Sequence, residues 1–313
     1  TTTALAQRGR SILYKLINRL HEDNKAVLFI SHDLDELISV CNSITVLRDG
    51  AVIDTLGKEE ISVEKMRTLM VGRELTGSYY RSDYDGSFAE EVVLEANNVT
   101  SGILESFSLE LHQGEILGIG GLSDCGMHEL GRVLFGIDKP ITGEVTLKRS
   151  NVRVKNPNTA IRSGMAYVSK ERDREAIILS ASVKDNVVLP SLQSLSKALG
   201  LITRQSETRM TNEQIETLSI KCRDGNQICK ELSGGNKQKV VFSKWLAKNS
   251  DILILDCPTR GIDVGVKAAM YRLMTELKAQ GKSIVMISEE LLELIGMSDR
   301  ILVIKDGKTQ AEL

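Results

Sequence analysis

The sequence predicts an α/β protein with a largely parallel sheet, built from the end of one domain and most of a second, similar domain. Three apolar runs are predicted to be buried strands, namely Ile116–Ile119, Ile252–Leu255 and Ser283–Ile287. Helix-favouring stretches such as Val266–Ala279 alternate with these runs, and that alternation is typical of a parallel sheet. The second observation is an internal repeat.

The repeat aligns without a gap. Residues 26–50 and 283–307 match at an offset of 257 positions (283 − 26), with 10 of 25 pairs identical. In the same register Thr2 meets Thr259, so Thr1 corresponds to Pro258. We therefore expect a piece of a longer tandem protein that starts inside the first copy and stops before the end of the second.

The repeat also sets the expected boundaries. Residues 1–76 are predicted to be the C-terminal part of a first domain, with a short amphipathic helix at 63–70. Residues 77–90 are polar, rich in glycine and serine, and are predicted to be a linker. We expect residues 91–313 to form the second domain, truncated at its C-terminus. Within it, residues 183–235 lack strand runs and are predicted to form an inserted helical subdomain.

Composition and charge argue against some classes of function. The 313 residues are 42% hydrophobic and 26% charged, with a net charge of −2. This balance gives no electrostatic reason to expect nucleic acid as a partner. The five cysteines are scattered and form no CxxC pair, which favours a reducing compartment such as the cytosol over a disulfide scaffold.

A glycine-rich turn follows the first predicted strand. Gly121 and Gly126 occupy the glycine positions of the pattern GxxxxGK[S/T], and Ser123 lies between them. In that pattern, backbone N–H groups and a helix N-terminus bind phosphate. Met127 stands in place of the lysine, and His128 stands in place of the hydroxyl residue that binds Mg²⁺. On its own, such a turn is more often only a tight connection.

A second motif ends the apolar strand at Asp256. A strand that ends in aspartate matches the Walker B motif, whose carboxylate helps to hold Mg²⁺. The next residue supplies the general base in a working ATPase, and here it is Cys257. Apolar strands that end in aspartate are common, so this motif is weak alone.

The most specific motif is the run Leu232-Ser233-Gly234-Gly235-Asn236. A serine and two glycines at a predicted helix start present a hydroxyl and N–H groups to an anion. The alternative is a helix N-cap with a flexible turn. That alternative does not explain why Asp256 and the run PTRGID at 258–263 follow at fixed spacing, since three ordered motifs rarely coincide.

These motifs resemble the ATP-binding cassette ATPases. Nearly the whole chain is similar to the tandem-cassette ATP-binding subunits of bacterial monosaccharide importers of the ribose, galactose and xylose type, most clearly at 71–75, 114–118, 232–241 and 260–265. The resemblance implies a P-loop NTPase cassette with a parallel-sheet core, an antiparallel β subdomain and an inserted helical subdomain, preceded by the C-terminal part of a first cassette.

The resemblance also implies a function for the whole protein, which is to couple ATP binding and hydrolysis to sugar import at the cytoplasmic face of a bacterial plasma membrane. The implied partners are a dimeric integral-membrane permease, an extracytoplasmic sugar-binding protein that acts indirectly, and the missing half of the first cassette. One alternative is a nucleoside importer ATPase. Others are a soluble tandem-cassette ATPase of the translation type, expected to have a long charged linker and two intact sites, and a purely regulatory domain.

In the family that this chain resembles, the signature of one cassette closes over the phosphate loop of the other. For the first site, the resemblance implies that Ser233 and Gly235 face the nucleotide and that Asp263 bridges the interface. It also implies that His32, which follows an apolar run expected to be a strand, is the switch histidine. The alternative for His32 is an ordinary surface histidine.

The second site departs from the family pattern. Besides Met127, His128 and Cys257, Lys170 stands where the Q-loop glutamine or glutamate is expected, and Glu289 replaces the switch histidine. We expect this site to bind ATP and Mg²⁺ weakly or not at all, with Asp256 as the metal ligand if nucleotide binds, and we expect this chain alone to be inactive. The positions predicted to contact nucleotide at the two sites are Gly121, Ser123, Gly126, Met127, His128, Lys170, Ser233, Gly234, Gly235, Asp256, Cys257 and Glu289.

Four side chains, Cys125, His128, Asp256 and Cys257, are expected to converge at the altered site, and these residue types can bind zinc. Their spacing matches no known zinc pattern. The favoured interpretation is that small residues fill a vacated nucleotide pocket.

Overall fold

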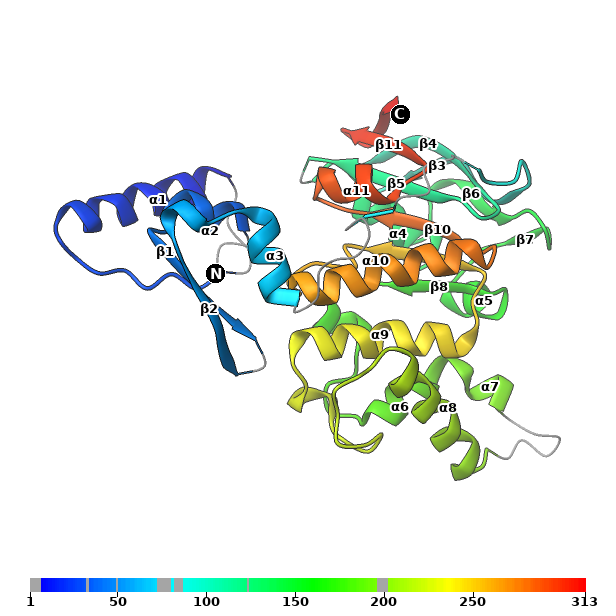
Figure 1. Ribbon diagram of the computed structural model, residues 1–313. Coiled ribbons are helices and arrows are strands. Elements are labelled where there is room, and N and C mark those ends of the chain that lie inside the picture. The colour runs from blue at the N-terminus through cyan, green and yellow to red at the C-terminus, as the bar shows by residue number, and fades with distance from the viewer. Residues whose placement is uncertain are drawn as a thin grey trace. The chain divides into compact units, whose positions relative to one another are not determined.

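The computed structural model describes residues 7–31, 34–48, 50–71, 80–81, 87–122, 124–195 and 202–313 (Figure 1). The chain divides into two compact units, Thr1–Tyr79 with Asp263–Ala268 and Tyr80–Ile262 with Ala269–Leu313. Among the described residues, no helix has both the length and the apolar character that crossing a membrane requires.

The first unit is a small helix and hairpin assembly. Strand β1 (Ser43–Arg48) pairs antiparallel with β2 (Ala51–Gly57). A core of buried side chains that includes Leu37, Leu56 and Met66 joins the hairpin to the second and third helices of this unit. The helices are α1 (Gln7–Glu22), α2 (Leu34–Val40) and α3 (Val63–Val71), and a 3₁₀ turn spans Lys58–Glu60. Helix α3 coincides with the short amphipathic helix predicted at 63–70.

The sequence repeat extends to the backbone. The elements α1, α2, β1 and β2 recur as α10 (Val264–Ala279), α11 (Leu291–Met297), β11 (Arg300–Lys305) and β12 (Lys308–Glu312), starting 257 positions later in each case (264 − 7, 291 − 34, 300 − 43, 308 − 51). Both hairpins also change register at the same place, between positions 46 and 47 and between positions 303 and 304.

One strand expected from the repeat is absent. Residues 26–30 match β10 (Ser283–Ile287), but the structure has no strand there, and Leu28 is 90% exposed. Strand β10 is buried between β5 (Ile116–Gly121) and β9 (Ile252–Asp256), with which it forms ladders. The described residues of the first unit include no counterpart of β5 or β9, so the sheet that would order this run is missing. The expectation of a strand before His32 is therefore wrong for this structure.

The second unit contains the predicted parallel sheet. In the described part of the chain its strand order is β12-β11-β5-β10-β9-β8, where β8 is Met165–Val168. All neighbours run parallel except β12, which pairs antiparallel with β11 at the edge. Every residue of β9 and β10 is buried, as expected for apolar runs covered on both faces. The predicted α/β class is confirmed.

The antiparallel β subdomain and the helical subdomain that the resemblance implies are also present. A four-stranded antiparallel sheet has the order β4-β3-β6-β7, and its strands are β3 (Val92–Ser101), β4 (Leu104–His112), β6 (Thr142–Leu147) and β7 (Val152–Arg153). Figure 1 shows α6 to α9 gathered on the opposite side of this unit. The helices described between β5 and β9 are α4 (Met127–Leu134), α5 (Pro157–Arg162), α6 (Val183–Val188), α7 (Leu192–Leu195), α8 (Arg204–Thr217) and α9 (Gly234–Lys248).

Local signals explain where these helices begin. Ser182 caps α6 through a reciprocal bond pattern with Asp185, and Thr203 caps α8. Asn156 caps α5, in which a proline occupies the first turn. Each cap satisfies a backbone N–H that the helix leaves unpaired. The described part of 183–235 contains no strand, in agreement with the predicted helical insertion, although α9 continues to Lys248.

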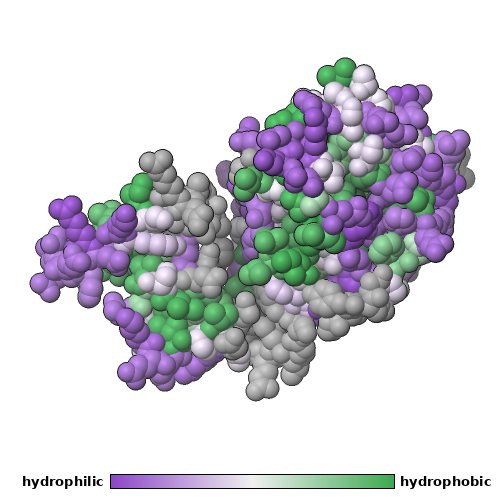
Figure 2. Space-filling model, turned by 90° about the horizontal axis from the view of Figure 1, so that it is seen from above, coloured by the Kyte–Doolittle hydropathy of each residue, from purple (hydrophilic) through white to green (hydrophobic). Residues whose placement is uncertain are grey.

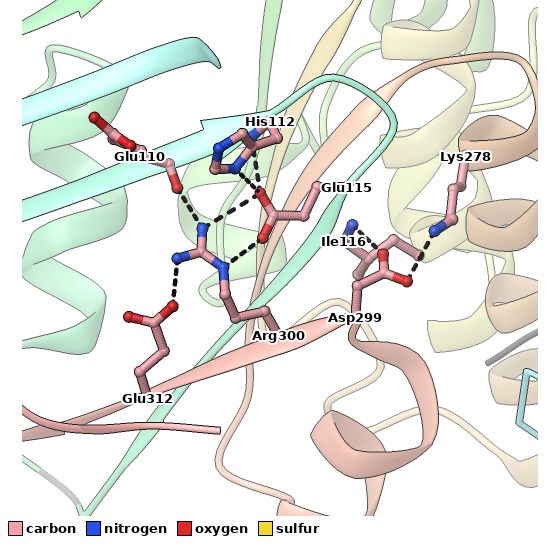
Figure 3. A network of polar contacts seen from close by, with 8 residues as sticks. All are labelled: Glu110, His112, Glu115, Ile116, Lys278, Asp299, Arg300 and Glu312. Atoms are coloured by element: carbon pink, nitrogen blue, oxygen red, sulfur yellow. Dashed lines mark hydrogen bonds and ion pairs between the residues drawn. The ribbon is translucent and has the colours of Figure 1, made fainter. Parts of the chain in front are cut away.

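A buried polar network fixes the amino end of β5 (Figure 3). The Asp299 carboxylate accepts hydrogen bonds from the N–H of Ile116 and from Lys278 Nζ, both at 2.8 Å, and from Arg81 Nη2, also at 2.8 Å. The neighbouring Arg300 donates to the carboxylate of Glu115 at 2.8 Å. In open α/β sheets ligands bind at the carboxyl ends of strands, so this network stabilises the fold and is not a candidate binding site.

The surface is mixed in character. Figure 2 shows hydrophobic patches among hydrophilic residues on the face that it presents, on both units. Apolar side chains exposed on helix α11 include Leu291, Leu292 and Ile295.

Candidate functional site

The glycine-rich turn joins β5 to α4, and its two glycines are required by the backbone. A Cβ atom on Gly121 would lie 2.4 Å from the Ile304 carbonyl oxygen, and one on Gly126 would lie 2.9 Å from Ile103 Cγ2. Gly126 has a φ of 103° at the N-cap of α4, where a side chain would be strained. The turn therefore has the strand-to-helix form that the pattern predicts. Ser123 lies outside the described residues.

The two residues that follow Gly126 point to different environments. The Met127 side chain is 1% exposed and belongs to the core. His128 is 13% exposed at its side chain, and its Nδ1 lies 2.7 Å from Asp256 Oδ1. On the other side of the ring, Nε2 lies 3.4 Å from Glu289 Oε1. This second contact has ion-pair distance but no hydrogen bond, and Nε2 is buried without a hydrogen-bond partner among the described residues.

Asp256 ends β9 and is 1% exposed. One carboxylate oxygen contacts His128, and the other accepts a hydrogen bond from the Tyr167 hydroxyl at 3.2 Å. Burial, followed by the negative charge of Asp256, raises the pKa of Tyr167, so this phenol stays protonated and donates. Both oxygens of Asp256 are therefore bonded to protein groups.

Tyr167 was not singled out from the sequence. It lies on β8, and its register partner on β9 is Ile254, two positions before Asp256. Only the pairing of β8 with β9 brings the two side chains together, and the sequence alone carries no signal for that pairing.

Cys257 follows Asp256 in an unusual backbone conformation. Its φ is 47°, a left-handed value that few residues other than glycine and asparagine adopt. Its N–H donates to the Ile287 carbonyl oxygen at 2.9 Å, and its side chain is buried. Burial, with the negative charges of Asp256 and Glu289, raises the pKa of the Cys257 thiol. The thiol is therefore neutral at physiological pH and cannot act as the general base.

Three of the four side chains expected to converge are found together. One potential metal-ligand atom from each of His128, Asp256 and Cys257 lies within 4.8 Å of the other two. Cys125 is not part of this group among the described residues. Its thiol packs against the backbone of Gly121 inside the turn, so the expectation that Cys125 joins the cluster is wrong.

The signature residues form a second group, at the start of α9. Ser233 is the N-cap, and its Oγ accepts hydrogen bonds from the Asn236 N–H at 3.4 Å and from Asn236 Nδ2 at 2.9 Å. Ser233 is exposed, and the partly buried Gly234 and Gly235 form the first turn. The N-cap geometry considered as the alternative reading is thus present, and it leaves an exposed hydroxyl at a helix N-terminus.

The order of these motifs agrees with a comparison to known families. A family model described as ABC transporter matches residues 104–260, which is 157 residues (260 − 104 + 1) of the 313. The chain belongs to the ABC transporter family. This family consists of nucleotide-binding ATPase cassettes, typically with Mg²⁺.

Individual ABC proteins match over more of the chain. The ribose import ATP-binding protein RbsA of Bacillus subtilis is 38% identical over 312 residues, which cover 100% of this chain and 63% of that protein. The protein of the same name from Lactococcus lactis subsp. cremoris is 38% identical over 307 residues, covering 98% and 62%. The chain thus spans less than two thirds of the length of these relatives.

Solved structures of ABC cassettes share the fold of the second unit. A dimeric ATP-binding cassette bound to ADP and Pi has a TM-score of 0.61 at 24% identity and covers 70% of this chain and 97% of its own. CbiO1 of Clostridium perfringens, described as part of an ABC transporter complex, has a TM-score of 0.58 at 20% identity and covers 71% and 88%. At these identities the likeness concerns the fold alone.

Within the ABC cassette, the segment after β8 contacts the signature helix. Lys170 is half-buried two residues beyond β8, and the π-helical turn Arg172–Ala176 follows. Arg172 Nη1 donates to the Gly234 carbonyl oxygen at 3.2 Å, and Lys237 Nζ lies 3.1 Å from an Asp173 carboxylate oxygen. Burial raises the pKa of Asp173, but hydrogen bonds from Arg172 and Lys237 outweigh burial and lower it overall. Sequence reasoning missed Arg172 and Asp173, which no motif marks.

The segment after β9 is held by buried side chains. Gln238 of α9 donates to the Pro258 carbonyl oxygen at 2.6 Å. The buried Glu293 carboxylate accepts hydrogen bonds from the hydroxyls of Thr259 and Ser288. Ser288 precedes Glu289, so one carboxylate ties the segment after Cys257 to the segment that carries Glu289.

Two predicted site residues remain, Asp263 and His32. Asp263 is exposed, and its Oδ1 accepts a hydrogen bond from the Val266 N–H at 3.0 Å, which caps α10. His32 lies outside the described residues. Its neighbour Ser31 donates to Glu36 at 3.0 Å, the same pair as Ser288 and Glu293 at the repeat offset of 257 (288 − 31, 293 − 36).

Proposed function

We propose that the whole protein is the ATP-binding subunit of an ABC importer for a simple sugar, ribose or a close relative. The observation that carries this proposal is the 38% identity to ribose import ATP-binding proteins over 98–100% of the chain. That identity includes both units, and their shared elements at one constant offset support a tandem arrangement of two cassettes.

The same likeness indicates the partners and the place of action. The subunit docks on a dimeric permease at the cytoplasmic face of a bacterial plasma membrane, and an extracytoplasmic sugar-binding protein delivers the substrate to that permease. The first-cassette phosphate loop, which precedes residue 1 in the repeat register, completes the first ATP site. The net charge of −2 offers nothing that attracts nucleic acid.

The two ATP sites of the whole protein differ in competence. At the first site, Ser233 and Gly235 from the signature face the nucleotide of the other cassette, with His32 as the switch and Asp263 at the interface. The exposed hydroxyl of Ser233 at the start of a 15-residue helix supports this role, because the N-terminus of a helix favours anions.

The second site does not fit Mg²⁺ and a triphosphate, and it is proposed to be non-hydrolytic. The Met127 side chain lies in the core instead of reaching toward phosphate. The imidazole of His128 contacts the Asp256 carboxylate where Mg²⁺ would bind in a competent site. Cys257 offers a neutral thiol in place of a carboxylate base. A charged hydrogen bond contributes about 1.5–3 kcal/mol. Losing two of them therefore weakens nucleotide binding on the order of 10³-fold at about 1.4 kcal/mol per decade.

Two other functions give different expectations. A nucleoside importer would show the same cassette chemistry with a different transported substrate. A soluble translation-type ATPase would have a long charged linker, whereas residues 77–90 here are short, polar and rich in glycine and serine. The relatives' names favour sugar import over both.

Reconstitution tests the proposal. The full-length protein is assembled with its permease in vesicles and supplied with the sugar-binding protein, and uptake is measured for radiolabelled ribose, galactose, xylose and adenosine. We expect ATP-dependent uptake of one sugar and none of adenosine. Uptake of adenosine and of none of the sugars would show that the protein serves a nucleoside importer instead. ATP hydrolysis that neither permease nor sugar changes would overturn the importer assignment.

A further inference from the structure

The cluster at the carboxyl end of β9 has an electrostatic feature that a merely vacated pocket does not explain. The side chain of Asp256 is 2% exposed, and its contacts are a histidine ring and a neutral phenol. A second carboxylate, Glu289, lies on the far side of the same ring. Burying a carboxylate is costly unless a cation lies close to it. The site of the family's cation therefore still brings two carboxyl groups together around one imidazole ring, although it has lost the residues that bind nucleotide.

We propose that His128, Asp256 and Cys257 bind a zinc ion at this site. The ligands are His128 Nδ1, a carboxylate oxygen of Asp256 and Cys257 Sγ, with water at the fourth position, and Glu289 orients the histidine ring through Nε2. This proposal rests on the proposed loss of nucleotide hydrolysis at the second site.

The donor set selects zinc over magnesium. Mg²⁺ requires oxygen ligands in octahedral geometry, whereas Zn²⁺ accepts nitrogen, sulfur and oxygen in a tetrahedron. In the family pattern, positions 128, 256 and 257 all carry oxygen, from a hydroxyl residue, the Walker B aspartate and the carboxylate of the general base. His128 and Cys257 change these three positions to one nitrogen, one oxygen and one sulfur. Both changes are in the direction of zinc.

The distances between the three candidate ligand atoms are close to those expected when zinc is bound. Zinc–ligand distances of about 2.0–2.3 Å place tetrahedral ligand atoms about 3.3–3.8 Å apart. The three candidate ligand atoms lie within 4.8 Å of one another. His128 Nδ1 and Asp256 Oδ1 are 2.7 Å apart, so they need to separate by less than about 1 Å for an ion to bind between them.

Glu289 supplies the outer contact that a zinc-bound histidine commonly has. When Nδ1 binds a metal, the ring proton is on Nε2, and such histidines donate that proton to a carboxylate or carbonyl. Nε2 of His128 is buried and has no hydrogen bond to any residue that the structure describes, and Glu289 Oε1 lies 3.4 Å away. Because Glu289 is 43% exposed at its side chain, it is able to close this distance.

Zinc binding also balances charge and protons. Cys257 binds as a thiolate, so its thiol proton leaves to solvent, and metal binding at this site is expected to weaken as pH falls. The ion would join the start of α4, the end of β9 and the segment after β10. Bound Mg²⁺ and nucleotide join the same three elements in a competent cassette.

The test is a metal titration of the purified full-length protein. The protein is stripped with a chelator, and Zn²⁺ binding is measured by competition with a chromophoric chelator in the wild type and in Cys257→Ser, His128→Gln and Glu289→Gln. We expect one zinc per chain. Loss of a ligand should weaken binding at least tenfold, and loss of the orienting Glu289 should weaken it about 10–100-fold. Cys125→Ser is the matched control, a buried cysteine of the adjoining turn that is outside the cluster, and it should bind zinc like the wild type.

Cobalt gives a second readout. Co²⁺ bound through Cys257 should show a thiolate-to-metal charge-transfer band that the isosteric Cys257→Ser lacks, with circular dichroism confirming that both proteins are folded. Zinc binding no stronger than in Cys257→Ser, or a cobalt spectrum without that band, would overturn the proposal. ATP hydrolysis is measured on the same proteins as a separate readout. The metal-binding result can therefore be interpreted even if the importer assignment fails.

Discussion

His128 Nδ1 lies 2.7 Å from Asp256 Oδ1 at the carboxyl end of β9. A hydroxyl residue at position 128 would leave room there for a cation beside the carboxylate, and the imidazole instead contacts the carboxylate directly. Together with Tyr167, the ring bonds both oxygens of Asp256. Neither oxygen of Asp256 is therefore left open for Mg²⁺.

Nucleotide affinity follows from this contact. We expect the chain to bind MgATP with a dissociation constant in the high micromolar range or above, measured by calorimetry. The double variant Met127→Lys with His128→Ser restores one charged donor and one hydroxyl, so affinity should rise by about tenfold or more, at roughly 1.5–3 kcal/mol for the charged hydrogen bond. Sub-micromolar binding by the wild type would show that backbone N–H groups of the turn hold phosphate unaided.

The buried ion pair between Arg81 and Asp299 predicts a large stability effect. Their side chains are 0% and 1% exposed, and Arg81 also donates to the Met297 carbonyl oxygen at 3.0 Å. Arg81→Ala removes one partner of a buried pair, so the free energy of unfolding should fall by about 3–5 kcal/mol. Urea unfolding measures the change, and Lys308→Ala, which breaks an exposed pair with Glu105, should have a much smaller effect. Equal effects would mean that Arg81 contributes little to the fold.

Lys244 predicts a pH-dependent stability. Burial lowers the pKa of Lys244 from 10.5 to about 8 in the folded state, and its ammonium donates to the Ala176 carbonyl oxygen. Between pH 8 and 10.5 the unfolded state binds more protons than the folded state, so the contribution of this group to stability rises with pH across that window and is least favourable below pH 8.

The variant Lys244→Met removes that charge. It should raise the free energy of unfolding at pH 7 by about 3 kcal/mol at most, given about 1.36 kcal/mol per pKa unit, and the gain over the wild type should shrink between pH 8 and 10.5. Thermal unfolding of both proteins at several pH values gives the difference, which cancels contributions from the buried cysteines. A gain that stays constant with pH would contradict a shifted Lys244.

Removing the Glu293 carboxylate is expected to lower stability, because two segments of the chain bond to it. Its buried carboxylate accepts hydrogen bonds from the hydroxyls of Thr259 and Ser288, so Glu293→Ala should lower the free energy of unfolding by roughly 2–4 kcal/mol, because each buried hydroxyl left without an acceptor costs about 1–3 kcal/mol. Glu293→Gln keeps one acceptor oxygen and should cost less. If urea unfolding finds both variants equal to the wild type, these hydroxyls do not depend on the carboxylate.

The fold was largely predictable because buried apolar runs leave few alternatives. Ile252–Leu255 and Ser283–Ile287 could only be strands covered on both faces, and the structure has β9 and β10 there. The repeat could not predict the missing strand at 26–30. A strand forms only with neighbours, and no sequence pattern of the run itself reports whether β5-like and β9-like partners accompany it.

The candidate site was predictable only where motifs carry it. The spacing of the phosphate-loop, Walker B and signature patterns located His128, Asp256 and Ser233. The hydrogen bond from Tyr167 to Asp256 spans 89 positions and depends on strand pairing, so no motif includes it. Cys125 was expected to converge with His128, Asp256 and Cys257 at the altered site. The tight turn between β5 and α4 instead directs its thiol into the packing against Gly121.

A variant at the start of the signature helix tests the proposal that the first site hydrolyses ATP and the second site does not. Ser233 is exposed at the N-cap of α9, and under the proposed function a nucleotide held by the first cassette contacts its hydroxyl. Ser233→Arg places a bulky side chain in that interface and removes the cap, so ATP hydrolysis and sugar uptake by the full-length protein with its permease should be nearly abolished.

Two comparisons make this result specific. Arg223→Ala alters another exposed position of the helical subdomain, where Arg223 pairs with Glu231 at 2.9 Å, and it should leave hydrolysis and uptake close to wild type. Cys257→Ala should retain most of the hydrolysis rate, because a neutral thiol next to Asp256 supplies no base there, whereas loss of a working base would abolish turnover. The measurement is the hydrolysis rate and the initial rate of uptake for the three variants, with expression and thermal unfolding compared to the wild type. If Cys257→Ala is as damaging as Ser233→Arg in a folded protein, the second site turns over nucleotide and its proposed inactivity is wrong.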